Sequence, residues 1–124
     1  EYVNYKLRVE RDREVSRNNA IAEVLRSFLP ALDDLSRAEV HGDLEGSPFA
    51  AVAAKLRAAG EKFGLKQFGE KGDKFDPEFH EALIQTESGE VSVNTVADVV
   101  EPGYLLGERV IRVAKVAVFI PAES

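Results

Sequence analysis

Residues 1–29 contain neither glycine nor proline, so nothing in the sequence interrupts a helix there. The half from Lys6 to Asn19 is mostly charged and has few large apolar side chains. From Ile21 to Leu35, large apolar residues recur at mostly three- and four-residue spacing, which lays a broad apolar stripe along one face of a helix. The polar half cannot bury much surface alone, so it is either frayed or paired along a thin seam with another helix.

A second helix is predicted after a short loop. Pro30 lies inside the apolar pattern and should kink the first helix, which then resumes to about Val40. Ser47 and Pro48 are residue types that begin a helix, and Gly64 is a type that ends one. One such helix pair leaves apolar faces uncovered, whereas two copies could form a four-helix bundle. The residues predicted at this dimer interface are Ile21, Val24, Leu25, Phe28, Leu32, Leu35, Val52 and Leu56.

After Gly64 the pattern changes to short β-branched segments separated by turn residues. Strands are predicted over residues 65–68, 82–86, 96–100 and 110–120. Hairpin turns are predicted at Ser88–Gly89 and Gly107–Glu108, and a type II turn at residues 101–104. The prediction is an α+β fold: a helical dimerisation region over residues 1–64, then a small, mostly antiparallel β domain over residues 65–124.

The sequence offers little for catalysis. It has no cysteine and two histidines, His41 and His80, which lie far apart, so neither thiolate chemistry nor a specific transition-metal site is expected. It also lacks a phosphate-binding glycine loop and a serine nucleophile motif. We therefore expect neither an enzyme nor a cofactor. We interpret His80 as a structural residue beside a turn that Asp76 caps.

Charge and hydropathy narrow the choice of partners. The net charge of -6 argues against nucleic acid, whose phosphates require a basic face. No apolar run is long enough to span a membrane. Residue 1 is Glu and there is no methionine, so we expect the chain to be part of a longer protein. Basic residues outnumber acidic ones between Leu105 and Ile120, which indicates either an ordinary solvated surface or a face for an acidic partner.

Two segments at a fixed separation resemble the signature of a known family. The first, residues 75–83, reads Phe-Asp-Pro-Glu-Phe-His-Glu-Ala-Leu, and the second, residues 103–118, begins Gly-Tyr-Leu-Leu-Gly-Glu-Arg. These two segments, which follow a long predicted helix in the sequence, resemble the signature of GrpE, the nucleotide exchange factor of DnaK-type heat-shock chaperones. The resemblance spans nearly the whole chain. The resemblance implies a cytoplasmic homodimer that binds the chaperone's ATPase domain and accelerates ADP release without binding nucleotide itself.

The resemblance also implies which residues contact the chaperone. They are Arg109, Val118, Val100, Lys6 and Arg37. Arg109 matches a family arginine that meets the chaperone's acidic surface, whereas Val15 and Asn19 depart from family positions that are basic or aromatic. For Lys6 and Arg37 the other interpretation is ordinary solvated helix charge. The alternative function is a structural coiled-coil adaptor with a β cap and no effect on nucleotide.

Overall fold

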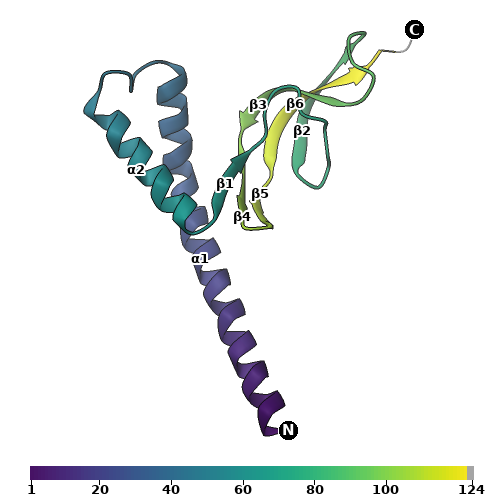
Figure 1. The fold of residues 1–124 in the computed structure, drawn as a ribbon. Helices are drawn as coiled ribbons and strands as arrows, with labels where there is room; N and C mark the ends of the chain where they lie inside the picture. The colour runs from purple at the N-terminus through teal and green to yellow at the C-terminus, as the bar shows by residue number, and fades with distance from the viewer. Residues whose placement is uncertain (123–124) are drawn as a thin grey trace.

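A long helix, a shorter helix and a small group of strands make up the protein (Figure 1). The structure, a computed structural model, describes residues 1–122. Its elements are α1 (Tyr2–Val40), α2 (Pro48–Lys62), β1 (Leu65–Phe68), β2 (His80–Ser88), β3 (Thr95–Glu101), β4 (Gly103–Leu106), β5 (Arg109–Arg112) and β6 (Ala114–Pro121). We call the six strands the β module. The predicted α+β class is confirmed.

The two halves of α1 have different surroundings. The N-terminal half extends away from the rest of the chain (Figure 1), and from Glu1 to Ala20 every residue except Val9 is exposed. The C-terminal half lies beside α2 and the β module. The helix continues through Pro30, which is exposed, and ends at Val40 as predicted.

Local residue types begin and end α2. The Ser47 hydroxyl accepts a hydrogen bond from the Phe49 N–H at 3.1 Å, and Pro48 occupies the first helical position. After the helix, Gly64 has a φ of 91°, a left-handed conformation that glycine adopts without steric cost. The predicted start and stop signals are confirmed.

The β module consists of two three-stranded sheets. In the first, β4 lies between β1 and β5, and both pairs are antiparallel. In the second, β6 lies between β2 and β3, parallel to β2 and antiparallel to β3. Leu106 lies opposite Arg109, and Gly107 between them has a φ of 62°. The predicted two-residue hairpin at Gly107–Glu108 is therefore confirmed.

The predicted strand over residues 110–120 is wrong, because the chain changes sheets at Val113. Residues before it form β5 of the first sheet, and residues after it form β6 of the second. Ala114 is fully buried, and its N–H donates to the Phe79 carbonyl at 2.9 Å. This hydrogen bond leads the chain away from β5 and into the register where it pairs with β2.

Two predicted turns are also wrong. The segment at Ser88–Gly89 is not a hairpin, because β6 lies between β2 and β3. Gly103 belongs to β4 and lacks the positive φ that a type II turn requires. Its small size serves packing instead: a Cβ at this position would lie 2.3 Å from Cζ of the Phe68 ring.

Two apolar clusters hold these layers together. The first joins α1 to the first sheet and contains Ala22, Leu29, Leu32, Leu65, Tyr104 and Ile111. The second fills the second sheet and contains Val96, Ala114, Val116 and Val118. At its edge His80 is buried, and its Nδ1 accepts a hydrogen bond from the Asp76 N–H at 3.0 Å. The first cluster therefore places the β module against α1.

Candidate functional site

Arg112 is the polar centre of the contact between α1 and the β module. Its guanidinium donates to both carboxylate oxygens of Asp33, at 2.7 Å and 2.8 Å, a bidentate ion pair. It also donates to the Pro102 carbonyl at 3.0 Å and 2.6 Å. Glu101 lies 3.3 Å away, and the guanidinium stacks over the Tyr104 ring at 5.3 Å from its centroid. One side chain thus joins α1, β5 and the link between β3 and β4.

Burial and charge in this cluster change two pKa values. Burial alone would lower the pKa of Arg112, but the hydrogen bond and charge of Asp33 outweigh it and raise the pKa above its usual value. Burial raises the pKa of the Tyr104 phenol, and the Asp33 carboxylate raises it further. Arg112 is therefore charged and Tyr104 neutral at physiological pH.

Two further hydrogen bonds extend this contact along α1. The pairs are Asn19 with Arg109, Arg26 with the Ile111 carbonyl, and Asp33 with Arg112. The first two measure 2.7 Å and 3.3 Å. The three helical residues are seven positions apart, which is about two helical turns, so they lie on one face of α1. We call this row of contacts with β5 the seam.

The apolar residues of α1 separate into two stripes. Ala22, Leu29 and Leu32 are buried in the first cluster, with Leu25 and Leu35 packed against it. Val24 and Phe28 are more than half exposed, at 55% and 53%. Leu32, predicted at the dimer interface, therefore lies in the core of this chain.

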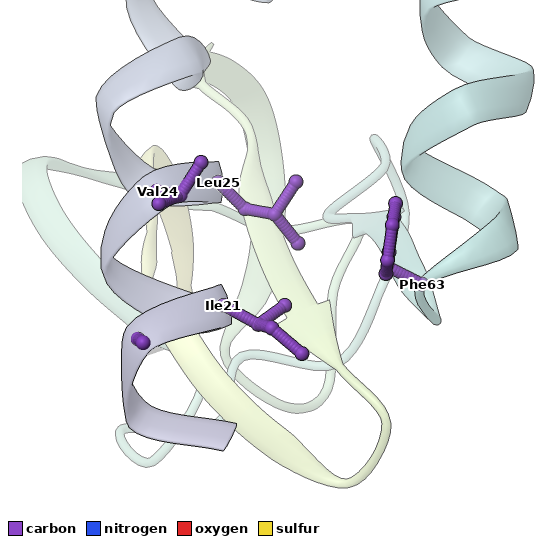
Figure 2. Close-up of a pocket in the computed structure, with 5 residues that line it drawn as sticks. Ile21, Val24, Leu25 and Phe63 are labelled. Carbon is purple, nitrogen blue, oxygen red and sulfur yellow. The ribbon is translucent and has the colours of Figure 1, made fainter. Parts of the chain in front are cut away.

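An apolar hollow lies between the two helices. It has a volume of about 210 Å³ and is lined by Ala20, Ile21, Val24, Leu25 and Phe63. Figure 2 shows Ile21 and Leu25 directed from α1 toward the Phe63 ring at the end of α2. On α2, Phe49, Val52, Leu56 and Phe63 are all exposed. Both helices thus present apolar side chains that the chain itself leaves uncovered.

The five predicted chaperone contacts lie in different places. Arg37 and Val100 line the same groove, which has a volume of about 370 Å³ and lies between the end of α1 and the β module. Arg109 is exposed at the β4–β5 hairpin, and Lys6 is exposed in the N-terminal half of α1. Val118 is only 2% exposed, because its side chain packs in the second cluster. That burial makes Val118 a core residue and corrects its placement as a surface contact.

Comparison with known protein families identifies the family of this chain. The GrpE family model matches residues 1–119 of the chain. The chain belongs to the GrpE family. GrpE proteins similar to it include that of Leifsonia xyli, 54% identical over 98% of this chain and 55% of the relative. That of Tropheryma whipplei strain Twist is 50% identical over 95% of this chain and 62% of the relative. "Protein GrpE 1" of Streptomyces avermitilis is 48% identical over 98% of this chain and 54% of the relative.

The chain spans somewhat more than half the length of the curated GrpE relatives named here. The two GrpE-like segments of the sequence meet in the second sheet, although they are separated along the chain. His80 of the first lies opposite Ala114 of the second, and Ala82 lies opposite Val116. The parallel pairing of β2 with β6 therefore brings the two segments together in space.

The part of the chain that the structure describes offers neither a metal cluster nor a membrane span. Within residues 1–122, no three or more His, Cys, Asp and Glu side chains gather as a metal ion would require. No helix in the same range is long and apolar enough to cross a membrane. The seam, which the sequence did not predict, gave one weak signal: Asn19, Arg26 and Asp33 are polar residues at seven-residue spacing beside an apolar stripe.

Proposed function

We propose that this chain is a nucleotide exchange factor, a co-chaperone of the stress response that binds the ATPase domain of a DnaK-type chaperone and accelerates ADP release. The observation that carries the proposal is the GrpE family match over residues 1–119. Exchange of this kind needs higher affinity for the open, nucleotide-free ATPase domain than for the closed one. By linkage, bound nucleotide must weaken binding of the exchange factor by the same factor.

The active form in this proposal is a homodimer. Apolar residues that the chain leaves exposed or partly exposed on both helices support it. Ile21, which is partly buried, and the exposed Val24 and Phe28 follow a three-four spacing on α1. The exposed Phe49, Val52 and Leu56 follow the same spacing on α2. Such a pattern is typical of helices that pack in a bundle. Two copies that join these faces would form a four-helix bundle. The helix face that joins this bundle would be backed by Leu25, Leu32 and Leu35, which pack in or against the first cluster of their own chain.

Chaperone contact would use the surfaces on either side of the seam. The groove between Arg37 and Val100 offers one cation and one exposed apolar side chain, which is 59% exposed. Arg109 offers a guanidinium that can form a bidentate pair with a carboxylate of an acidic ATPase domain. Lys6 would contribute along the helix. Val118 is not part of this set because it is buried.

The proposed mechanism needs no covalent chemistry, cofactor or bound nucleotide on this chain. The shape and charge of its surface would bind one conformation of the partner's ATPase domain more tightly than the other, and this difference in affinity would drive exchange. A reducing compartment suits a chain without cysteines, so we place its action in the cytoplasm. The alternative, a structural adaptor with a β cap, shares the same surfaces but predicts no change in nucleotide release.

Stopped-flow release of fluorescent ADP from a DnaK-type chaperone tests the proposal. A nucleotide exchange factor raises the release rate constant with concentration until the effect saturates. An adaptor binds the chaperone, as seen by calorimetry or sedimentation, but leaves the rate constant unchanged. An unchanged rate constant at saturating protein would therefore reject the proposed function in favour of the adaptor.

A further inference from the structure

We propose that Arg112 and Asp33 are positioning residues for nucleotide exchange. Their ion pair fixes the orientation of the β module on α1, and with it the placement of Val100 relative to Arg37 across the groove. The inference rests on the proposed function for its effect on exchange. Its structural part, the orientation of the β module, stands on the contacts of this chain alone.

The apolar contact between α1 and the β module does not select one orientation by itself. The first cluster joins the two mainly through aliphatic side chains such as Leu29, Leu32 and Leu65. Hydrophobic contact is non-directional, so it holds the helix and the sheet together without aiming one at the other. Hydrogen bonds with fixed geometry are needed to choose among these arrangements, and the seam supplies them.

Arg112 supplies the most directional of these contacts. Its planar guanidinium meets Asp33 through two parallel hydrogen bonds and the Pro102 carbonyl through two more. The side chains are enclosed: Arg112 is 18% and Asp33 is 7% exposed. A buried pair of this kind contributes specificity of arrangement more than net stability. The other two seam contacts are single hydrogen bonds, and the one from Arg109 is exposed.

One member of the pair, Asp33, forms part of the wall of the groove. Asp33, Arg37, Val100 and Pro102 all line it. Arg37 lies four residues after Asp33, about one turn along α1, and Val100 lies two residues before Pro102. The ion pair therefore holds together the two short segments that carry the candidate contacts, although neither Arg112 nor Asp33 needs to touch the chaperone.

Loss of the pair would reduce the fraction of molecules in the competent orientation. Apparent affinity falls in proportion to that fraction, whereas a saturating concentration restores the full rate. If about one fifth of the molecules remain competent, the apparent dissociation constant rises about fivefold. A residue that acts only on stability would not alter the orientation of a chain that stays folded.

The test uses Asp33→Asn, which keeps the shape and removes the charge, and Arg112→Lys, which keeps the charge and removes the planar fork. The matched control is Glu39→Gln, because Glu39 pairs with Arg57 between α1 and α2 and is not among the residues that line the groove. The chain has no cysteine, so Glu23→Cys and Gln85→Cys, both at exposed positions of α1 and β2, take spin labels specifically. Labelled protein is mixed with excess unlabelled protein so that each measured distance lies within one chain.

The distance between the two spin labels should have a narrow distribution in the protein with an intact Arg112–Asp33 pair and in Glu39→Gln. In Asp33→Asn and Arg112→Lys this distribution should be broader or displaced. In the ADP-release assay, the two seam variants should need about fivefold more protein for half-maximal stimulation and reach the same maximum. Circular dichroism identifies a variant that fails to fold, in which case the other seam variant decides.

Three results would overturn the inference. An unchanged distance distribution in folded seam variants would show that the pair does not set the orientation. A broadened distribution with unchanged stimulation would show that orientation does not govern exchange. Equal loss in Glu39→Gln would indicate a general effect of helix charge. If the unaltered chain fails to stimulate ADP release, the proposed function fails, and the distance measurement still decides the structural part.

Discussion

Arg112 and Asp33 form a bidentate ion pair across 79 positions of sequence. The guanidinium of Arg112 also covers one face of the Tyr104 ring. This cluster is the point where the helix, the first sheet and the β3–β4 link meet. Within the cluster, the pKa values of Arg112 and Tyr104 are both raised, and the raised pKa of Tyr104 has a consequence that can be measured.

Stability should fall in alkali partly through Tyr104. Burial first, and then the Asp33 carboxylate, raise the pKa of its phenol in the folded state above the ordinary tyrosine value of 10.0. As the pH rises above the ordinary value, the Tyr104 phenol loses its proton in the unfolded chain before it does so in the folded protein. The unfolded state is then favoured, and the free energy of unfolding declines. Urea unfolding between about pH 8 and pH 11 should show this decline in the unaltered protein and a smaller one in Tyr104→Phe. Tyr2→Phe, at an exposed position, is the control, and an equal effect of both changes would contradict the assignment.

Gly103→Ala should destabilise the β module. The added Cβ would lie 2.3 Å from the Phe68 ring, so the ring or the strand must move. Overpacking of this kind costs about 1–3 kcal/mol of unfolding free energy. Gly89→Ala is the matched control, because a Cβ there meets nothing within 4 Å. Phe68→Leu should recover part of the loss in Gly103→Ala, and an absence of any recovery would argue against the ring as the cause.

Phe28→Asp should convert the proposed dimer to monomers while the β module stays folded. Phe28 is 53% exposed in the single chain and lies on the outer stripe of α1. Burying such a side chain in a dimer is worth about 1.5–3 kcal/mol per copy, and a charge there would be desolvated without a partner. Sedimentation equilibrium gives the mass directly. Val100→Asp, at a similarly exposed position in β3, should leave the mass unchanged. A monomeric mass for the unaltered chain at micromolar concentration would contradict the dimer.

Arg109→Ala should weaken binding to a DnaK-type ATPase domain by about 1–3 kcal/mol, the range for a charge-assisted hydrogen bond. Arg109 is exposed, so its removal should leave the fold intact. Lys66→Ala, at another exposed basic position, should bind normally. Asn19→Ala removes the hydrogen-bond partner of Arg109 within the chain but keeps the guanidinium. If Asn19→Ala weakens binding as much as Arg109→Ala, the effect comes from orientation rather than from direct contact.

The N-terminal half of α1 should open first on heating. Residues 1–20 are exposed except Val9, so little burial within the chain opposes their opening. Hydrogen exchange followed by mass spectrometry should show early exchange in peptides from this half and strong protection in β6. Circular dichroism at a helix wavelength should show a low-temperature transition that β signals do not share. A single transition seen by both probes would contradict this prediction.

Local features of the fold could be predicted from the sequence because their causes are local. The start of α2 depends on Ser47 and Pro48, and the turn after it depends on Gly64. The hairpin at Gly107–Glu108 likewise depends on residues within the turn. In each case the residues that determine the conformation are adjacent in the chain, so their types are sufficient.

The misplaced features depend on partners far away in sequence. The β-branched run after Arg109 looks like one strand, and only the contacts of Arg112 with Asp33 and of Ala114 with Phe79 divide it. Val118 follows a strand pattern that does not reveal which face is covered, and the structure places it inside. Leu32 likewise belongs to a stripe that the sequence assigned to the dimer interface, and the structure packs it against the chain's own first sheet.

The position of β6 between β2 and β3 also has a consequence for how the protein is made. During synthesis on the ribosome, α1, α2 and the first sheet can all assemble before the last strand emerges, because none of them pairs with it as a sheet neighbour. β2 and β3 must wait for residues 114–121, since each is paired only with β6 among the strands. Until then the backbone donors and acceptors that pair with β6 are free, which is the state in which nascent strands associate wrongly. While residues 114–121 are still inside the ribosome, β2 and β3 therefore remain exposed, and the emergence of β6 ends that exposure.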